Sequence, residues 1–195
     1  TFSWMKKTAK KKQAAITGSV IIVENQKYYN RLYFVFPDGR YETYDKKHLF
    51  SFAEEHKTFS PGNKKIILEF KGWKICPLIC YDLRFPVWSR NVEEYDLLIY
   101  VAYWPHVRIP AWDALLRARA VENMCYSVGV NGIGTDGNGH TYSGHSAIYG
   151  PLGNLLSTED YEKELSETIS LNKTELMDIR QKMAFLEDRD SFKII

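Results

Sequence analysis

The sequence predicts a single domain of the α/β or α+β sandwich class over residues 1–195. Three observations lead to this prediction. Short apolar runs of strand length alternate with stretches of helical periodicity, turn residues separate the two, and the chain is long enough to bury a substantial core. Because strands and helices alternate, packed layers can cover each other's apolar faces.

The first third of the chain predicts a helix and then an antiparallel sheet. A helix is expected over residues 1–13, with an apolar stripe formed by Trp4, Met5 and Ala9. Strands rich in β-branched and aromatic residues are expected over 14–23, 27–36 and 40–44, joined by turns at Asn25-Gln26 and at Pro37-Asp38-Gly39. A polar loop over 46–63 then leaves the sheet, and sites are often built in such loops.

The remaining chain alternates strands and helices. Strands are expected over 66–70, 73–79, 96–102, 126–131, 142–149 and 165–170. A helical turn is expected over 87–91, and Pro110 opens a helix with an apolar face formed by Trp112, Leu115, Leu116, Ala120 and Met124. Asn172 is expected to cap a last helix that runs to about Ala184. The glycine-rich loop after 131 predicts turns and not a phosphate cradle, because no helix with a lysine follows it.

Composition argues against several classes of partner. The formal net charge is +2, so no nucleic-acid or membrane partner is implied, and we interpret the five lysines between Lys6 and Lys12 as a solvated helix face. The sequence has no apolar run of about 18 residues and no secretory signal pattern at its start. Three cysteines, an odd number, fit a reducing cytoplasm better than a disulfide framework. No cysteine and histidine set has zinc spacing, so we expect no structural metal. We also expect no cofactor.

Cys80 is the first candidate for chemistry. The apolar run from Ile75 to Ile79 predicts a buried strand that ends at this cysteine, and a polar turn follows it. A cysteine at such a strand end resembles a nucleophile elbow, in which the next backbone N–H faces the developing oxyanion. The alternative is an inert cysteine of the core.

A second polar group follows the neighbouring strand. If the strands over 73–79 and 96–102 are parallel, then Tyr103, Trp104 and Arg108 reach the same sheet edge as Cys80. Arg108 could then bind a carboxylate through two parallel hydrogen bonds, which suits an acidic substrate. A surface arginine is the alternative.

Several motifs together resemble one family. They are Tyr44-Asp45-Lys46-Lys47-His48-Leu49-Phe50, Glu54-Glu55 before Pro61-Gly62, Cys80-Tyr81-Asp82-Leu83-Arg84-Phe85-Pro86, Tyr103-Trp104-Pro105, the segment 116–123, and Val130-Asn131 before the segment 134–139. In this order they resemble the carbon–nitrogen hydrolase (nitrilase) superfamily. Within it the chain is most similar to the omega-amidase branch, and the match runs from about Ala14 to Leu186.

The resemblance implies a fold and a reaction. The fold would be an αββα sandwich, two sheets with helices outside, often doubled across a dimer interface, so a homodimer or higher homo-oligomer is expected. The reaction would be removal of ammonia from the amide end of a small carboxylate-bearing amide, a 2-oxo diacid monoamide, through a cysteine thioester.

The resemblance also assigns roles to residues. Cys80 would be the nucleophile, with Lys46 as the cation that stabilises the thiolate and then the oxyanion, next to the backbone N–H of Tyr81. A free thiol has a pKa of about 8.5, so such a cation is needed. Glu55 would hold Lys46. Lys47 and Glu54 are the neighbouring residues with which these two could be confused.

Further residues are expected in or near the pocket. His145 stands where relatives often have an aspartate, and we expect it to line the pocket together with Tyr103 and Trp104. We expect buried structural ion pairs, and no chemistry, from Arg84, Arg117 and Glu122.

The chain starts at Thr1, without an initiator methionine and within an expected helix. The resemblance places the principal general base, another glutamate, on a strand upstream of this point. We therefore expect that the domain is truncated at its N-terminus, and that the 195 residues alone have little or no turnover.

Three other interpretations stay open. A cysteine–histidine hydrolase would use His48 or His145 as its base. A catalytically degenerate member of the family would serve as a binding subunit. Another amidase or a carbamoylase of the superfamily would differ in acyl specificity.

Overall fold

A computed structural model of the protein describes residues 1–159 and 161–194. The N-terminal part forms a helix and an antiparallel sheet, as the sequence predicts. The helix α1 is Phe2–Lys12, and the strands are β1 (Ile16–Glu24), β2 (Lys27–Val35) and β3 (Tyr41–Asp45), which pair in the order β1-β2-β3.

A second sheet carries the strand that ends at Cys80. Its strands are β4 (Leu68–Phe70), β5 (Trp73–Ile79), β6 (Leu97–Ala102), β7 (Tyr126–Asn131) and β10 (Ala147–Tyr149), in the order β10-β7-β6-β5-β4. The strands β5, β6 and β7 are parallel, and the flanking β4 and β10 are antiparallel to their neighbours. A separate hairpin joins β8 (Ile133–Thr135) and β9 (Thr141–Ser143).

Helices connect or follow these strands. The α-helices are α2 (Pro86–Ser89), α3 (Ile109–Asn123) and α4 (Lys173–Met183). Short 3₁₀ helices are η1 (Ser51–Ala53), η2 (Glu55–Lys57), η3 (Cys80–Arg84) and η4 (His106–Arg108). The predicted cap of α4 is confirmed, because the Asn172 side chain accepts a hydrogen bond from the Glu175 backbone N–H. Among the described residues, no helix is long and apolar enough to cross a membrane.

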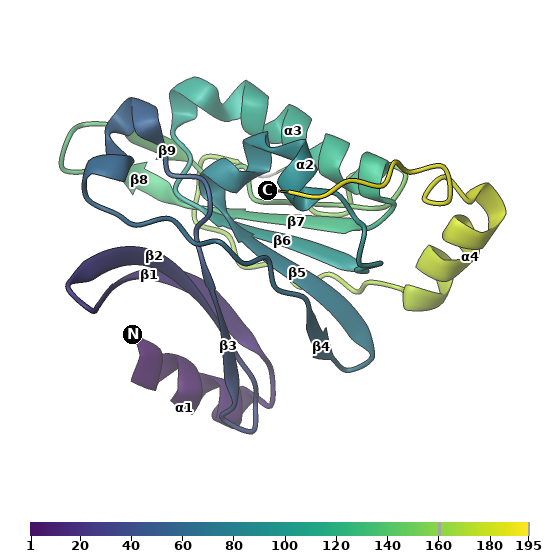
Figure 1. The fold of residues 1–195 in the computed structure, drawn as a ribbon, viewed down its shortest axis with the longest axis horizontal. Helices are drawn as coiled ribbons and strands as arrows, with labels where there is room; N and C mark the ends of the chain where they lie inside the picture. The colour runs from purple at the N-terminus through teal and green to yellow at the C-terminus, as the bar shows by residue number, and fades with distance from the viewer. Residues whose placement is uncertain (160, 195) are drawn as a thin grey trace.

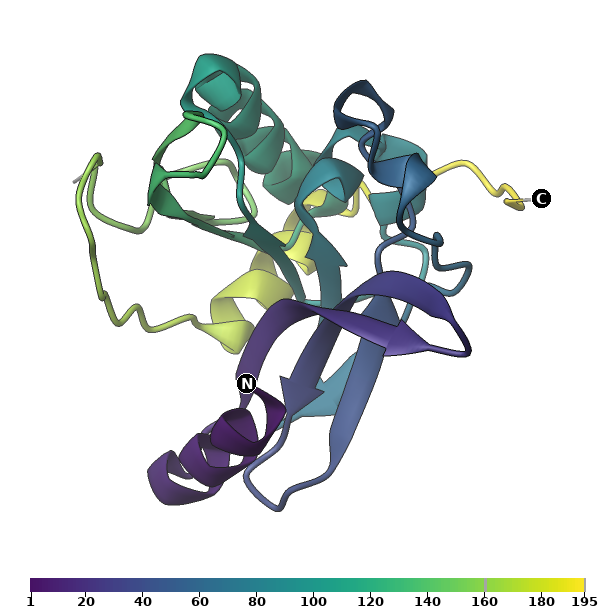
Figure 2. The ribbon, with the colours of Figure 1, turned by 90° about the vertical axis from the view of Figure 1, so that its left-hand side faces the viewer.

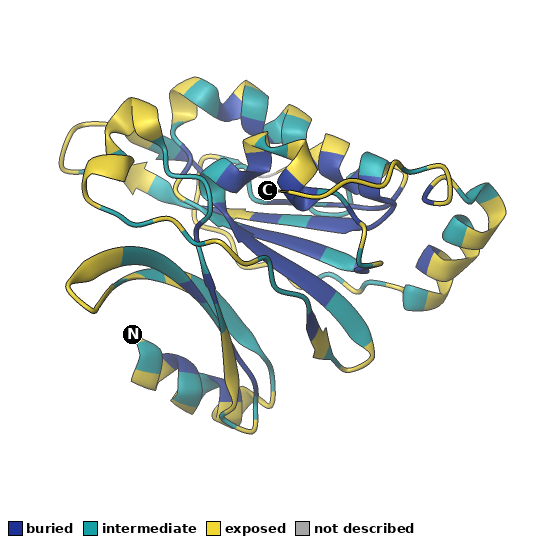
Figure 3. Ribbon diagram, viewed as in Figure 1, coloured by how far each residue is buried: buried dark blue, intermediate teal, exposed yellow. Residues whose placement is uncertain are grey.

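The elements stack as helix, sheet, sheet and helix. The helix α1 covers the outer face of β1–β3, and α2 and α3 cover the far face of the second sheet (Figures 1 and 2). Side chains of β2 and β3, such as Leu32 and Tyr44, share one buried core with Leu78 of β5 and Trp112 of α3. Figure 3 shows buried residues along β5, β6 and β7. The predicted αββα sandwich is confirmed, and it leaves the C-terminal ends of β5 and β6 free to build a site.

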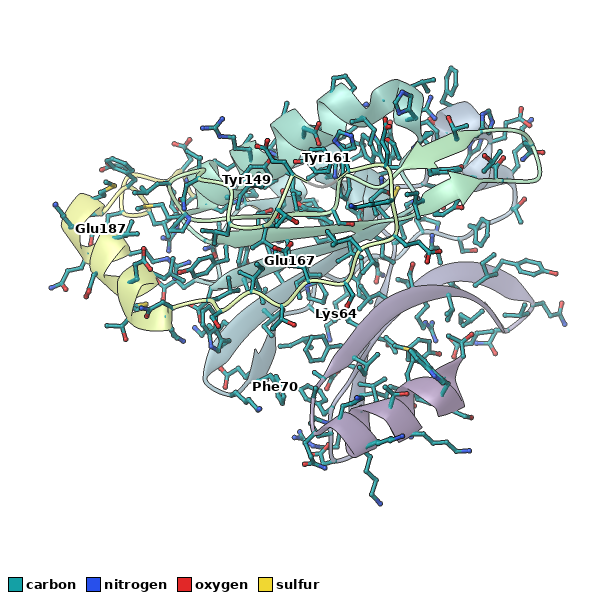
Figure 4. The ribbon with its side chains drawn as sticks, turned by 180° about the vertical axis from the view of Figure 1, so that it is seen from behind. Lys64, Phe70, Tyr149, Tyr161, Glu167 and Glu187 are labelled. Atoms are coloured by element: carbon teal, nitrogen blue, oxygen red, sulfur yellow. The ribbon has the colours of Figure 1, made fainter. Side chains whose placement is uncertain are left out.

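Two predicted strands are wrong. The strand expected over 142–149 breaks into β9 and β10, because Gly144 and His145 both have positive φ, at 74° and 58°. No strand forms over 165–170, which the described chain traverses without regular structure on the way to α4. Figure 4 shows the irregular segment that carries Tyr161 and Glu167 into α4. In this segment the Glu167 carboxylate accepts a hydrogen bond from the Thr158 backbone N–H at 3.1 Å.

The predicted buried ion pairs also need correction. Arg84 and Arg117 are exposed, whereas Arg119 of α3 is buried. Arg119 pairs with Glu122 at 2.7 Å and donates to the Leu83 carbonyl at 2.6 Å. Arg119 thus ties α3 to η3, and Glu122 keeps its predicted structural role with a different partner.

Candidate active site

Cys80 begins η3 directly after β5, at the C-terminal edge of the parallel strands. Its φ of 45° lies in the left-handed region, which costs a residue with a side chain of order 1 kcal/mol or more and is common at functional sites. This turn directs the chain sharply away from the sheet. Cys80 is therefore partly exposed at a strand end, whereas Cys76 and Cys125 are buried.

The carboxylate of Asp82 fastens this turn. Asp82 is completely buried, and it accepts hydrogen bonds from the Tyr44 hydroxyl at 2.7 Å and from the backbone N–H groups of Ile79 at 3.1 Å and His48 at 3.0 Å. A buried carboxylate needs such donors, because an unpaired charge there is costly. Asp82 thus joins the end of β5 to the segment after β3. No local sequence pattern around Asp82 indicates this role.

We expect Asp82→Ala to lower the free energy of unfolding by at least about 2 kcal/mol, because it leaves buried donors unpaired. Asp178→Ala, at an exposed position of α4, serves as the matched control and should change stability little. Urea unfolding followed by circular dichroism measures both. If the two variants have the same free energy of unfolding, Asp82 does not stabilise the fold as we infer.

Lys46 and Glu55 meet as a pair. Lys46 follows β3 and is 4% exposed, and its Nζ lies 2.6 Å from Glu55 Oε2. The same carboxylate oxygen accepts the Phe50 backbone N–H at 2.6 Å, which fixes the carboxylate inside its own loop. At the base of this loop, Gly62 donates to the Lys46 carbonyl, and a Cβ on Gly62 would lie 2.1 Å from the Asp45 carbonyl oxygen. Only glycine fits there, so the loop closes with the pair inside.

The neighbouring residues have different surroundings. Lys47 lies over the Trp88 ring, with Nζ 5.5 Å from its centroid, and Glu54 pairs with Lys57 at the surface. The sequence did not distinguish Lys46 from Lys47 or Glu55 from Glu54 by position. In the structure Lys46 and Glu55 form the buried ion pair.

Opposing influences act on the Cys80 thiol. Burial raises its pKa, and Lys46 and a backbone hydrogen bond from Tyr103 lower it, while Glu55 and Asp82 raise it further. Burial outweighs the others, so the pKa lies above its ordinary value. The resting group at neutral pH is therefore the thiol, and its proton must leave when it attacks.

A cavity of about 770 Å³ collects most of the predicted site residues. Its lining includes Lys46, Glu55, Cys80, Tyr81, Tyr103, Trp104 and Arg108. Trp104 is buried, and its indole N–H donates to the Arg108 carbonyl at 2.9 Å. A pocket of this size holds a small organic molecule.

Two arginines line the cavity. The Arg108 guanidinium lies 5.0 Å from the Phe50 ring centroid, and Arg108 has no ion-pair partner within the described chain. Arg84 lies over the Trp104 ring at 5.1 Å. Arg84, expected in a buried ion pair, therefore contributes a cation to the pocket. No local sequence pattern indicates this position, because the stacking of Arg84 on Trp104 depends on the fold.

His145 lies elsewhere. Of the residues that the structure describes, those lining the cavity do not include His145, which was expected there. Its Nδ1 lies 3.1 Å from Asp113 Oδ2, and its ring stacks on Tyr161 at 3.9 Å. Since Gly144 and His145 break the strand, the side chain turns to α3 instead of the pocket.

His48 also has other partners. Its ring stacks on Phe85 at 3.6 Å, and its Nδ1 lies 2.8 Å from Asp82 Oδ1. Within the described chain, His48 is not among the cavity-lining residues. Neither histidine of the alternative cysteine–histidine interpretation thus lines the pocket that holds Cys80.

The described residues contain no group of three or more histidine, cysteine, aspartate or glutamate side chains that could hold a metal ion.

A family model described as carbon-nitrogen hydrolase matches residues 1–178. The chain belongs to the carbon–nitrogen hydrolase family. As a carbon–nitrogen hydrolase, it is an enzyme that acts on carbon–nitrogen bonds other than peptide bonds.

Relatives of known sequence include amidases. An omega-amidase YafV of Escherichia coli is 43% identical to this carbon–nitrogen hydrolase over 192 residues, which cover 98% of this chain and 75% of the relative. A 2-oxoglutaramate amidase of Bacillus subtilis is 35% identical over 190 residues, which cover 95% of this chain and 73% of the relative.

Solved structures agree with the fold. A CN-hydrolase superfamily protein of Xanthomonas campestris, solved with an arsenic adduct in its active site, has a TM-score of 0.96 at 41% identity, covering 99% of this chain and 76% of that one. A variant of the Nesterenkonia amidase, with acrylamide added at the active-site cysteine, has a TM-score of 0.74 at 25% identity, covering 94% and 73%.

Asn131 is a further residue with a structural role that no local sequence pattern establishes. Its side chain accepts from the Trp104 backbone N–H at 2.6 Å and donates to the carbonyls of Trp104 at 3.1 Å and Gly144 at 2.7 Å. It thereby fastens the segment after β6 to the segment before β10. An asparagine at the end of the strand β7, directly before Gly132, was the available signal in the sequence.

Proposed function

We propose that this carbon–nitrogen hydrolase is an omega-amidase, which hydrolyses the amide of a small carboxylate-bearing substrate through a thioester on Cys80. One observation carries the proposal: Cys80 at its strained strand end shares a cavity with the buried Lys46–Glu55 pair. The names of the relatives from Escherichia coli and Bacillus subtilis support the reaction class. The active-site cysteine of the Nesterenkonia amidase supports a cysteine nucleophile.

The reaction runs in two halves. The Cys80 sulfur attacks the amide carbon, a C–S bond forms, and the carbonyl oxygen becomes an oxyanion that Lys46 and the Tyr81 backbone N–H stabilise. The C–N bond then breaks, and the nitrogen leaves as ammonia with a proton. Water attacks the thioester, which releases the acid and restores the thiol. The thiol proton passes to the leaving nitrogen in the first half, and a proton of the attacking water returns to the sulfur in the second.

Glu55 acts through Lys46. Because its Oε2 is held by the Phe50 backbone N–H, the carboxylate keeps the ammonium of Lys46 in one place within the cavity. A preorganised cation stabilises a developing oxyanion without reorganisation at the moment of reaction.

The carboxylate end of the substrate is assigned to Arg108. Its guanidinium lines the cavity and rests on the Phe50 ring, so it is oriented without a carboxylate partner in the described part of the protein. A guanidinium binds a carboxylate through two parallel hydrogen bonds. The preferred substrates are therefore 2-oxo diacid monoamides such as 2-oxoglutaramate.

We expect Arg108→Ala to lower kcat/KM for 2-oxoglutaramate by about tenfold or more, since a charge-assisted hydrogen bond is lost. Ammonia release by the full-length gene product measures this. The neutral ester of the same amide should be a poor substrate for the wild type and should respond little to the change. Arg117→Ala, at an exposed position of α3, is the matched control.

Other results would change the assignment. Equal rates on the acid and the ester would show that Arg108 does not bind the substrate carboxylate. Turnover of a simple nitrile alone would move the protein to another branch of the family. Loss of activity in EDTA would require a metal, which our mechanism does not use.

The competing interpretations have less support. A cysteine–histidine mechanism would need His48 or His145 near Cys80, but His48 contacts Asp82 and His145 contacts Asp113. A binding subunit would not need the strained Cys80 conformation. A carbamoylase or an amidase of other acyl specificity would use the same cysteine and lysine, and the substrate comparison above distinguishes it.

We also propose a homodimer or higher homo-oligomer that works in the cytoplasm. After α4, the side chains of Phe185, Phe192 and Ile194 are exposed, and a partner subunit could cover them. The cysteines are free thiols, which fits a reducing compartment. Sedimentation equilibrium tests the oligomer, and a monomer at micromolar concentration would contradict it.

A further inference from the structure

The backbone of Phe50 is fixed beside the Lys46–Glu55 pair. Phe50 directly precedes η1, and its backbone N–H donates to Glu55 Oε2 at 2.6 Å. This is the oxygen that also accepts from Lys46 Nζ. The Phe50 carbonyl accepts the backbone N–H groups of Ala53 at 3.1 Å and of Glu55 at 3.2 Å. Because both of its peptide groups are bonded within the loop, Phe50 has a set position relative to the pair.

The Phe50 ring contacts an arginine of the cavity. Phe50 and Arg108 both line the cavity, and the Arg108 guanidinium carbon lies over the ring, 5.0 Å from its centroid. A guanidinium within about 6 Å of a ring centroid is attracted to the face of the ring. The Phe50 ring also lies 4.9 Å from the ring of Tyr81, the residue after the nucleophile. The loop that holds Glu55 thus touches both Arg108 and the turn at Cys80.

Further rings support Phe50 from the side of this turn. The Tyr81 ring lies 5.1 Å from the Phe85 ring, which stacks on His48 at 3.6 Å. His48 Nδ1 lies 2.8 Å from Oδ1 of the buried Asp82. The row of rings therefore ends at the carboxylate that fastens the turn. This gives the Phe50 ring a firm support.

The Arg108 guanidinium has few other contacts. Within the described chain it forms no hydrogen bond or ion pair, and it lies over two rings, those of Phe50 and of Phe52 at 5.8 Å. Phe52 is 82% exposed, so Phe50 is the better fixed of the two. Arg84, the other arginine of the cavity, lies over Trp104 instead. A long side chain loses rotamer freedom when it binds a carboxylate, and a ring that already holds the guanidinium lowers this cost.

We propose that Phe50 is a positioning residue that holds the carboxylate-binding Arg108 in a set place relative to the Lys46–Glu55 pair. Its backbone holds the pair through Glu55, and its ring holds the guanidinium. One residue thereby relates the cation that stabilises the oxyanion to the cation that binds the far end of the substrate. This inference rests on the proposed role of Arg108, and it makes Phe50 a determinant of the preference for carboxylate-bearing amides.

The test measures ammonia release by the full-length gene product from 2-oxoglutaramate and from its neutral ester. The quantity compared is the acid-to-ester ratio, which is kcat/KM for the acid divided by kcat/KM for the ester. Phe50→Leu removes the ring and keeps the backbone N–H that binds Glu55. The ratio should fall about fivefold, as expected for a lost contact between a cation and a ring, and most of the fall should lie in KM for the acid. Phe50→Tyr keeps the aromatic face and should restore most of the ratio.

Two further variants serve as a control and as a replacement. Phe59→Leu alters a phenylalanine of the same loop that also lines the cavity, but no described lysine or arginine lies over its ring. It should change the rates on acid and ester by the same factor and leave the ratio as it is. Phe50→Met covers the case in which Phe50→Leu does not fold, because a long flexible side chain fills the space without an aromatic face. It should lower the ratio as Phe50→Leu does.

A double-mutant cycle shows whether Phe50 acts through Arg108. If it does, Phe50→Leu lowers the acid-to-ester ratio of the wild type and leaves the ratio of Arg108→Ala unchanged. The two effects are then not additive, as expected for residues in contact.

Three results would overturn the proposal. The first is an unchanged ratio in both Phe50→Leu and Phe50→Met. The second is a fall in the ratio that is equally large in the Arg108→Ala background, since Phe50 would then act on the substrate or the fold without Arg108. The third is an equal fall in Phe59→Leu. Failure of the proposed carboxylate contact is distinguishable, because Arg108→Ala alone would then keep the wild-type ratio.

Discussion

Replacing Cys80 by alanine should abolish amidase activity, with kcat lower by a factor on the order of 10⁴ or more, as for loss of a nucleophile in other hydrolases. The chemical reason is that no other thiol is placed to attack, because Cys76 and Cys125 are buried. Ammonia release from 2-oxoglutaramate measures the loss, and the unfolding curve shows whether the fold is kept.

Labelling provides the control for this prediction. Burial raises the pKa of Cys76 to about 12 and that of Cys125 well above its usual range. Iodoacetamide should therefore label Cys80 first, and activity should fall in step with that label. Cys125→Ala should keep its activity while losing some stability. Wild-type turnover by Cys80→Ala would refute the mechanism as a whole.

The elements that depend on local pattern could be predicted from the sequence. The apolar run of β5 and the polar turn after it identified Cys80, and the asparagine cap located the start of α4. The sequence predicted the strands β5 and β6 from their apolar, strand-length runs, but it left their parallel pairing as a condition, which the structure fulfils. In these cases the residues that determine the structure are neighbours in the chain.

The parts that failed depend on distant contacts. Asp82 looked like a turn residue, and only the Tyr44 hydroxyl and the His48 backbone, brought in from the β3 side, make it a buried anchor. The strand expected over 142–149 was plausible from its aromatic and β-branched residues. Its break at Gly144 is fixed by Asn131, whose side chain binds the Gly144 carbonyl from β7. No local pattern contains that contact.

In the pocket, too, some features follow from local sequence motifs and others from contacts between distant residues. The family motifs brought together Lys46, Glu55 and Cys80, whereas the surroundings of each arginine and histidine depend on which aromatic ring or carboxylate the fold brings close. Arg84 lies over Trp104, and His145 turns to Asp113.

Lys46→Ala should lower kcat by about 10²–10³, the cost of losing one donor to the oxyanion. Its side chain is 5% exposed, and it lies 2.6 Å from Glu55, so the change also leaves a buried carboxylate without its partner. We therefore expect a loss of about 3–5 kcal/mol in stability as well. The variant Lys46→Ala combined with Glu55→Gln should recover much of the stability and none of the activity, which separates the two effects.

The neighbouring residues supply the controls for Lys46. Lys47→Ala should be nearly silent in turnover, because the Lys47 ammonium lies over the Trp88 ring and not among the described residues that line the cavity. His48→Gln should lower stability through its contact with Asp82 and leave kcat within a few-fold of wild type. A severe loss of kcat in His48→Gln together with a mild one in Lys46→Ala would favour the cysteine–histidine mechanism. A severe loss of kcat in Lys47→Ala would show that Lys47, and not Lys46, is the cation that stabilises the oxyanion. Lys46 would then serve only as the buried ion-pair partner of Glu55.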